Sequence, residues 1–225
     1  MALQPEPVDV VIVVEDAVPA KAPPAAAADG IADPGPLGLA GFAMTTFVLS
    51  CFNSNLIKQP GLEGVVLPLA LFYGGTVQLL AGMWEFRKGN TFGALAFSSF
   101  GAFWLSFFFY VKYVAATLAP GTSVYEATGL FLLAWTIFTA YMLIASLRTT
   151  MAVAAVFLTL TVTFAFLAIG ALTAKGLAPG VNNGWTHIGG WIGLLTALCA
   201  WYASFAGVTN STFKKVVIPV GPLSK

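Results

Sequence analysis

Side chains that could perform catalysis or bind a metal are few in this sequence and lie far apart. The nine acids fall in tails, in loops or at the ends of long apolar stretches, and His187 is the only histidine. One histidine cannot form a two-histidine metal site, and there is no set of nucleophile, histidine and acid. The cysteines Cys51 and Cys199 lie inside apolar stretches and are interpreted as packing residues. We therefore expect no enzyme activity, no metal and no cofactor.

Neutral polar side chains inside the apolar stretches remain as candidates for contact with a solute. Four of them are interpreted as possible lining of a path, namely Thr45, Tyr73, Gln78 and Ser99. Hydroxyl groups can instead bond to carbonyls of their own helix, and this structural role would account for most such residues. Gln78 leaves two interpretations open because its amide needs several partners. It could bridge helices, or it could be a donor that lines a path.

The elements that must position these side chains are long apolar segments. The chain of 225 residues is 58% hydrophobic and 8% charged, whereas an ordinary soluble domain is about 25% charged. Six stretches reach the roughly 20 residues that cross a bilayer. The sequence thus predicts an all-α integral membrane protein with a bundle of six transmembrane helices, and the net charge of +1 provides no basic patch for nucleic acid. The predicted spans are 36–53, 64–84, 93–116, 126–147, 151–173 and 187–207.

The distribution of Lys and Arg predicts the orientation. Seven of these cations fall in the N-terminal tail, the second loop, the fourth loop and the C-terminal tail, against three in the other loops or span ends. Loops rich in Lys and Arg stay in the cytoplasm, so both termini are predicted to be cytoplasmic. Six spans, an even number, also place both termini on the same side of the membrane. The seven are Lys21, Arg87, Lys88, Arg148, Lys214, Lys215 and Lys225, and the three are Lys58, Lys112 and Lys175.

Three regions follow from composition. Residues 1–32 contain an Ala- and Pro-rich tract and are predicted to be a disordered cytoplasmic N-terminal tail, with a regulatory docking segment as the alternative. Residues 33–209 form the predicted six-helix transmembrane domain. Residues 210–225 are the predicted cytoplasmic C-terminal tail.

The first span begins with a distinctive run. Two prolines lie at its start, where the first N–H groups of a helix have no intrahelical partner anyway. The run closely resembles the Asn-Pro-Ala-Pro-Leu-Gly-Leu signature of the acetate uptake transporters, the succinate–acetate permease family. It departs from that signature by an Asp in place of Asn and a Gly in place of Ala. Its residues are Asp33, Pro34, Gly35, Pro36, Leu37, Gly38 and Leu39.

Further segments match the same family in the same order, over about residues 33 to 221. The segment 72–78 looks like the family's Phe-Tyr-Gly-Gly-x-x-Gln on the second span, and 89–93 with 96–104 looks like its third. Residues 166–170 resemble the fifth span and 190–193 the sixth. The run Ile-Pro-Val-Gly at 218–221 is similar to the family's closing Leu-Pro-Ile-Gly. Each motif alone is a weak signal, and together they are specific.

The resemblance implies a fold, a substrate class and a site. It implies a six-helix protomer that assembles as a hexamer, each protomer with its own path for acetate and, in some members, succinate or related short monocarboxylates. It also implies an apolar constriction, which in this sequence consists of Phe42, Phe100 and Leu160. The family has Tyr where this chain has Phe100, so a hydroxyl is missing from the constriction here.

An apolar constriction restricts what can pass. A bare carboxylate at bilayer depth costs at least a few kcal/mol, and a neutral acid avoids most of that cost. We therefore expect that a proton accompanies the substrate. We also expect that the protein is a homo-oligomer in the lipid bilayer of the cell (plasma) membrane. Two alternatives stay open. One is a pore for small neutral solutes such as urea or short amides, and the other is a non-transporting membrane sensor or scaffold that acts through the N-terminal tail.

Overall fold

The computed structural model describes residues 30–58, 61–117, 124–174 and 182–223. Within these ranges it has six helical segments long and apolar enough to span a membrane, as the sequence predicts. The first is α1 (Gly35–Asn53), and the last three are α5 (Tyr125–Ser146), α6 (Met151–Thr173) and α7 (Gly184–Phe213). Of the predicted N-terminal tail at 1–32, residues 1–29 lie outside the described residues.

The second and third spans are composite. The second runs from the 3-10 turn η1 (Leu62–Val65) through α2 (Val66–Leu71) and the π-helix η2 (Phe72–Val77) into α3 (Gln78–Arg87). The third consists of α4 (Thr91–Phe109) and the π-helix η3 (Tyr110–Val114), and the short 3-10 turn η4 (Ala115–Thr117) follows it. Single π turns inside α-helices are frequent at functional sites. Here η2 places Gly74 and Gly75 in the interior.

Local sequence fixes where several helices begin. The side chains of Asn90, Thr150 and Asn183 accept hydrogen bonds from the third N–H of α4, α6 and α7 respectively. Such caps satisfy donors that would otherwise have no partner. Between α3 and α4 the chain turns at Gly89, whose φ of 75° is unfavourable for a residue with a side chain.

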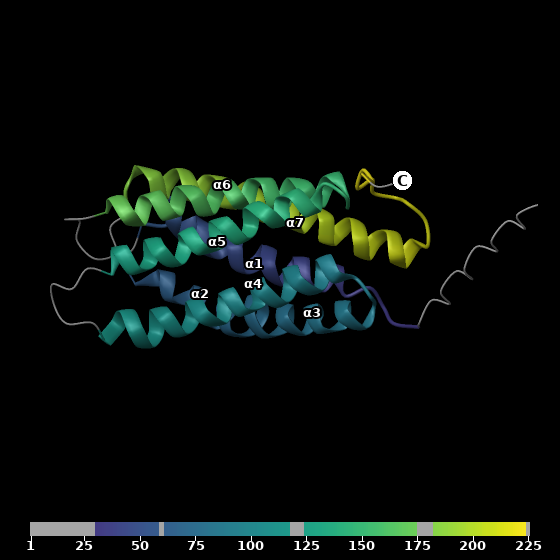
Figure 1. Cartoon of the computed structure of the whole chain (residues 1–225), viewed down its shortest axis with the longest axis horizontal. Helices are drawn as coiled ribbons and strands as arrows, with labels where there is room; N and C mark the ends of the chain where they lie inside the picture. Colours follow the sequence, from purple (N-terminus) through teal and green to yellow (C-terminus); the bar gives the residue numbers. More distant parts are fainter. Residues whose placement is uncertain (1–29, 59–60, 118–123, 175–181, 224–225) are drawn as a thin grey trace, which may run out of the picture. The chain divides into compact units, whose positions relative to one another are not determined.

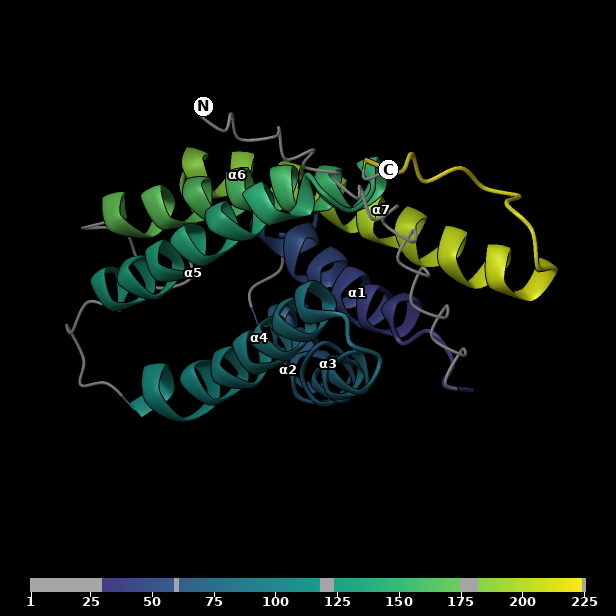
Figure 2. The ribbon, with the colours of Figure 1, turned by 45° about the vertical axis from the view of Figure 1, so that its right-hand side comes forward.

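The helices form two groups on either side of α1 (Figures 1 and 2). In Figure 2, α5, α6 and α7 lie on one side of α1, and α2, α3 and α4 lie on the other. Helices α1 and α7 pack closely because Gly190 leaves no side chain between them. A Cβ there would overlap the backbone of Asn53 and Ser54. Helices α3 and α4 approach in the same way at Gly101, where a Cβ would lie 2.7 Å from Leu79 N.

Two parts of the chain differ from the expectation. Glu85 was expected in the break between two spans, but it lies in the last turns of α3 and is only 1% exposed. Helix α7 continues to Phe213, six residues beyond the predicted end of the last span at 207.

The residues that follow α7 return to the start of α6. Gly221 O and Val220 O accept hydrogen bonds from Met151 N (2.7 Å) and Ala152 N (3.1 Å). Asn210 holds the same segment by accepting from Val217 N and Ile218 N and donating to Ile218 O. The segment therefore satisfies the first donors of α6 and becomes part of the bundle wall.

Candidate functional site: two cavities that meet at an apolar barrier

Two internal cavities lie in the bundle, one toward each end. Cavity 1, of about 320 Å³, lies where α1, α4 and α6 begin and α3 ends. Cavity 2, of about 240 Å³, lies toward the other end of α1 and α6 and is also bounded by α4 and α5. Both are lined mainly by apolar side chains. The polar residues of cavity 1 are Asp33, Gln78, Glu85, Asn90, Thr149 and Thr150. Those of cavity 2 include Thr46, Ser50, Asn53, Tyr110, Thr128, Thr163, Asn182 and Thr186.

The three residues expected at the constriction lie together where the cavities meet. Phe42 and Leu160 line both cavities, and no other described residue does so. Phe100 lines cavity 1, and its ring centroid is 5.6 Å from that of Phe42. All three side chains are 3% exposed. The side chains that separate the cavities therefore carry no polar group.

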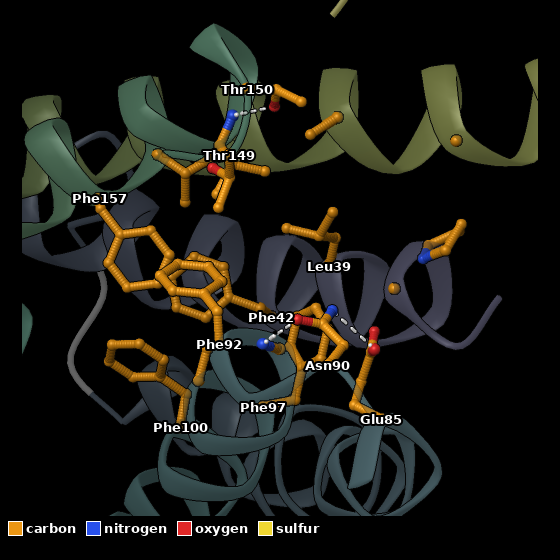
Figure 3. A pocket seen from close by; sticks show the side chains of 18 of the residues that line it. Leu39, Phe42, Glu85, Asn90, Phe92, Phe97, Phe100, Thr149, Thr150 and Phe157 are labelled. Carbon is orange, nitrogen blue, oxygen red and sulfur yellow. Dashed lines mark hydrogen bonds between the residues drawn. The ribbon is translucent and has the colours of Figure 1, made fainter. Parts of the chain in front are cut away.

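Phe100 lies at the centre of an aromatic cluster. Its ring also contacts those of Trp135, Phe138, Phe157 and Phe164 at centroid distances of 5.4 to 6.4 Å. Figure 3 shows Phe92, Phe100 and Phe157 gathered at one end of cavity 1, with Asn90 and Glu85 away from them. Rings fixed by so many neighbours form a rigid barrier, because each alternative rotamer must displace another ring.

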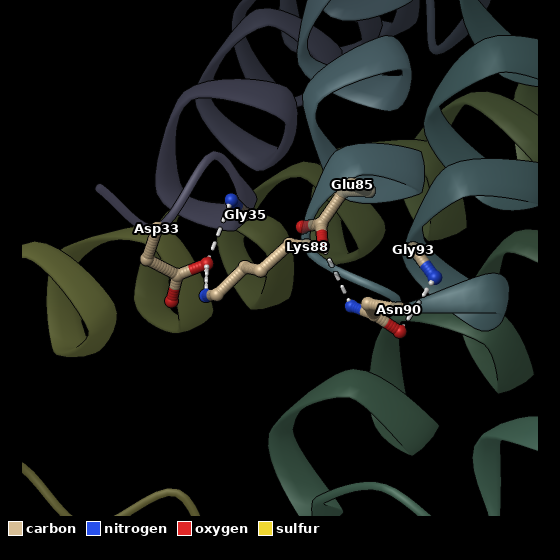
Figure 4. Close-up of polar contacts among 6 residues, drawn as sticks. All are labelled: Asp33, Gly35, Glu85, Lys88, Asn90 and Gly93. Atoms are coloured by element: carbon tan, nitrogen blue, oxygen red, sulfur yellow. Dashed lines mark hydrogen bonds and ion pairs between the residues drawn. The ribbon is translucent and has the colours of Figure 1, made fainter. Parts of the chain in front are cut away.

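One group of polar contacts in cavity 1 joins the start of α1 to the turn between α3 and α4 (Figure 4). Asn90 joins two elements, since its Nδ2 donates to Glu85 Oε2 (2.8 Å) and its Oδ1 accepts from Gly93 N (3.1 Å). Asp33 Oδ1 accepts from Gly35 N (3.1 Å) and forms an ion pair with Lys88 Nζ (2.8 Å). This pair is half-exposed, whereas Glu85 is buried.

Only one of the four polar candidates lines a cavity. Gln78 lines cavity 1 and is 1% exposed. Thr45 donates to Gly41 O within its own helix (2.9 Å) and lines neither cavity. Tyr73 and Ser99 line neither cavity either.

The signature at the start of α1 contributes to cavity 1 directly. Asp33, Gly35, Pro36 and Leu39 line it. Pro34 is the cap residue of α1, Gly38 packs against the ring of Phe97, and Leu37 is exposed. Ser204 on α7 donates to Pro36 O (2.6 Å), and this bond fixes the start of α1 against the neighbouring helix.

Several lining residues were not singled out from the sequence. Asn90 and Thr150 carry a readable signal, because each precedes a helix by one residue and caps it. Trp104 and Thr46 carry no such signal. Trp104 lies in a run of apolar residues, and Thr46 follows another threonine. Among the residues that the structure describes, no three His, Cys, Asp or Glu side chains are grouped as a metal would require.

Comparison with known proteins gives a consistent result. A model of the GPR1/FUN34/yaaH family matches residues 17–225. "Acetate permease A" of Emericella nidulans is 44% identical over 206 residues, which cover 84% of this chain and 65% of that protein, just under two thirds of its length. "Succinate-acetate/proton symporter SatP" of Escherichia coli is 38% identical over 196 residues, which cover 85% of this chain and 96% of the symporter.

A solved structure has the same fold. The structure described as that of the bacterial acetate channel SatP superposes with a TM-score of 0.75 at 37% identity, and the match covers 85% of this chain and 99% of the channel. These relatives are transporters or channels, and this chain is a multi-pass membrane protein with the same six-helix bundle. The family resemblance inferred from the motifs is confirmed, and the chain belongs to the GPR1/FUN34/yaaH family.

Proposed function

We propose that this protein transports acetate and related short-chain carboxylates, with succinate as a possible further substrate, through cavity 1, the barrier at Phe42, Phe100 and Leu160, and cavity 2. The observation that carries the proposal is that two internal cavities share Phe42 and Leu160 as lining residues. The names of the relatives supply the substrate class. Transport rather than catalysis fits the absence of any catalytic set of residues in the sequence.

The barrier favours a small and uncharged form of the substrate. An unpaired charge deep in a bilayer costs at least a few kcal/mol, and neither Phe nor Leu can offset it. Carboxylic acids titrate at about pH 4–5, so roughly one molecule in several hundred is neutral at pH 7. Passage of the neutral acid carries a proton with it. Proton-accompanied transport therefore needs no titratable group at the barrier, where the sequence provides none.

We further propose that the protein acts in the cell membrane as a hexamer with both termini in the cytoplasm. The turn between α3 and α4, the connection from α5 to α6 and the end of α7 carry Arg87, Lys88, Arg148, Lys214 and Lys215. Cavity 1 lies at the end of the bundle where these cations gather, so it would open toward the cytoplasm.

Uptake into sealed liposomes tests the proposal. Purified protein is reconstituted, and the uptake of labelled acetate is compared with that of labelled urea and with protein-free liposomes. Acetate uptake well above the lipid background, with little uptake of urea, is expected. Urea uptake without acetate uptake would favour the neutral-solute pore. If neither solute enters, the proposal is wrong and the sensor or scaffold becomes the better interpretation.

A further inference from the structure

An apolar groove of about 570 Å³ lies on the surface of the bundle, between α6, α7 and the segment that follows α7. Three of the side chains that line it, those of Met151, Leu198 and Tyr202, are 63%, 55% and 44% exposed. Its described lining carries two polar side-chain groups, the thiol of Cys199 and the hydroxyl of Tyr202. The hydroxyl already donates a hydrogen bond to Pro219 O. The groove therefore offers an apolar surface to a partner.

The groove lies where α6 begins its passage through the membrane. Met151 is the first residue of α6, and Ala155, which also lines the groove, lies about one turn further along. Leu198 and Tyr202 are likewise about one turn apart on the neighbouring α7. Exposed apolar patches mark contacts with a membrane or with another protein. At this depth the candidates are a lipid acyl chain and a second copy of the chain.

Three cations lie at the two ends of the returning segment (residues 214–223), which forms one side of the groove. Lys214 and Lys215 begin this segment directly after α7. Arg148 lies beside its other end, because the next residue, Thr149, accepts a hydrogen bond from Leu223 N (3.0 Å). All three cations are exposed, and none forms an ion pair with a residue that the structure describes.

In the described part of the chain, this end of the bundle has no free acid to pair with these cations. Of the described acids, Glu63 and Glu126 lie at the opposite end, where η1 and α5 begin. Asp33 is paired with Lys88. Glu85 is buried and accepts from the Asn90 amide. The three cations are therefore available to a negatively charged partner.

Charge favours a lipid over a second copy of the chain. Copies in one membrane share their orientation, so a neighbouring copy would bring the same end with the same unpaired cations, and like charges repel across an interface. An anionic phospholipid combines an acyl chain with a phosphate group. Each Lys or Arg near an anionic membrane surface strengthens binding by about fivefold.

We propose that this groove binds an anionic phospholipid, with an acyl chain between α6 and α7 and the phosphate group at Arg148, Lys214 and Lys215. Guanidinium and ammonium groups bind phosphate oxygens through strong, charge-assisted hydrogen bonds. The groove lies outside the proposed transport path, but Val220 lines both the groove and cavity 1. A bound lipid would therefore support a segment that contributes to the wall of that cavity.

The contribution of charge is tested by one variant and a matched control. The cation variant combines Arg148→Gln, Lys214→Gln and Lys215→Gln, all at exposed positions. The control removes the same charge from exposed positions that do not line the groove. Two of these are at the opposite end of the bundle, and one is at the end of α3, on the other side of α1 (Figure 2). Its substitutions are Lys58→Gln, Lys112→Gln and Arg87→Gln.

The contribution of the groove is tested in the same way. Ala155→Phe places a ring in the space proposed for the acyl chain. Its control, Leu158→Phe, places a ring on the same helix at a position that is 53% exposed and does not line the groove.

Binding of phosphatidylglycerol and of phosphatidylcholine to the purified, delipidated full chain is measured by native mass spectrometry, and the thermal midpoint is recorded for each variant. Wild-type protein should bind phosphatidylglycerol about tenfold more tightly than phosphatidylcholine, or better. The cation variant should bind phosphatidylglycerol about tenfold more weakly than wild type, or worse. Ala155→Phe should weaken binding about threefold or more, because the ring displaces the chain from its contacts. Both controls should match the wild type.

Several results would overturn the proposal. Equal affinity of the wild type for the two lipids would do so, as would a cation variant that equals its control. A folded Ala155→Phe protein that binds phosphatidylglycerol like the wild type would place the acyl chain elsewhere. Dissociation of the oligomer in Ala155→Phe, with lipid binding unchanged, would assign the groove to a second copy. If Ala155→Phe fails to fold, the cation variant decides, and because binding rather than flux is measured, the outcome is independent of the proposed function.

Discussion

Replacing Leu160 with Ala should widen the barrier between the cavities. Leu→Ala in a closed core costs about 2–5 kcal/mol, the larger values being for sites that leave a sealed void. Leu160 borders cavities of about 320 and 240 Å³, so the lost volume joins existing space. We therefore expect a loss of about 2–3 kcal/mol, at the lower end of that range. The variant should still fold.

The effect on flux follows from the barrier. Each 1.36 kcal/mol by which the barrier falls raises the rate tenfold. Widening lowers the cost of dehydration, so acetate uptake should rise several-fold. Propionate and butyrate, which have longer apolar tails, should gain more than acetate. Reconstituted protein and labelled acids in a side-by-side uptake assay measure both effects.

The matched control is Leu158→Ala on the same helix. Leu158 is 53% exposed and lines neither cavity, so its truncation should leave selectivity unchanged. A folded Leu160→Ala protein with the wild-type ratio of acetate to butyrate uptake would refute the assignment of Leu160 to the barrier.

Three further predictions concern the polar groups around cavity 1. Asn90→Ala should lower the free energy of unfolding by about 2–4 kcal/mol, because it removes a cap worth about 1 kcal/mol and leaves buried Glu85 without its amide partner. Asn90→Ser can keep the cap, so this variant should recover part of the lost stability. Thermal unfolding measures both effects. Lys88→Met should change the free energy of unfolding by less than about 1 kcal/mol, because its pair with Asp33 is half-exposed; a larger shift in the same assay would contradict this. Asn210→Leu removes three hydrogen bonds to the segment that returns to α6. Amide hydrogen exchange at residues 217 and 218 should therefore accelerate by more than tenfold. Unchanged exchange would show that other contacts hold this segment.

Apolar length was enough to predict the membrane spans. Each span is a continuous run of residues that cannot face water, so hydropathy alone located all six helices within a few residues, except at the end of α7. Burial of Glu85 could not be predicted in this way. In a hydropathy analysis, a charged residue such as Glu85 marks the end of a span. Only the structure shows that Asn90, which caps α4, donates a hydrogen bond to the Glu85 carboxyl group.

The site could be predicted only in part, mainly because the sequence does not show in which direction each side chain points. Thr45 and Thr46 are neighbours of the same type, but they point to different sides of α1. The sequence singled out Thr45, which bonds to its own helix, whereas Thr46 lines cavity 2. Phe42, Phe100 and Leu160 came from the family resemblance, because nothing in their local sequence distinguishes them from other core residues. The cavities that they separate depend on contacts among six helices, which one sequence does not specify.

The central claim, that solute passes between the cavities at Leu160, is tested most directly by blocking that point. The variant Leu160→Cys is made in a background with Cys51→Ser and Cys199→Ser, reconstituted, and labelled with a bulky thiol reagent, with Leu158→Cys as the control. Complete labelling, verified by mass, should abolish most acetate uptake at position 160 and leave it intact at 158. Full uptake by protein completely labelled at position 160 would contradict the account.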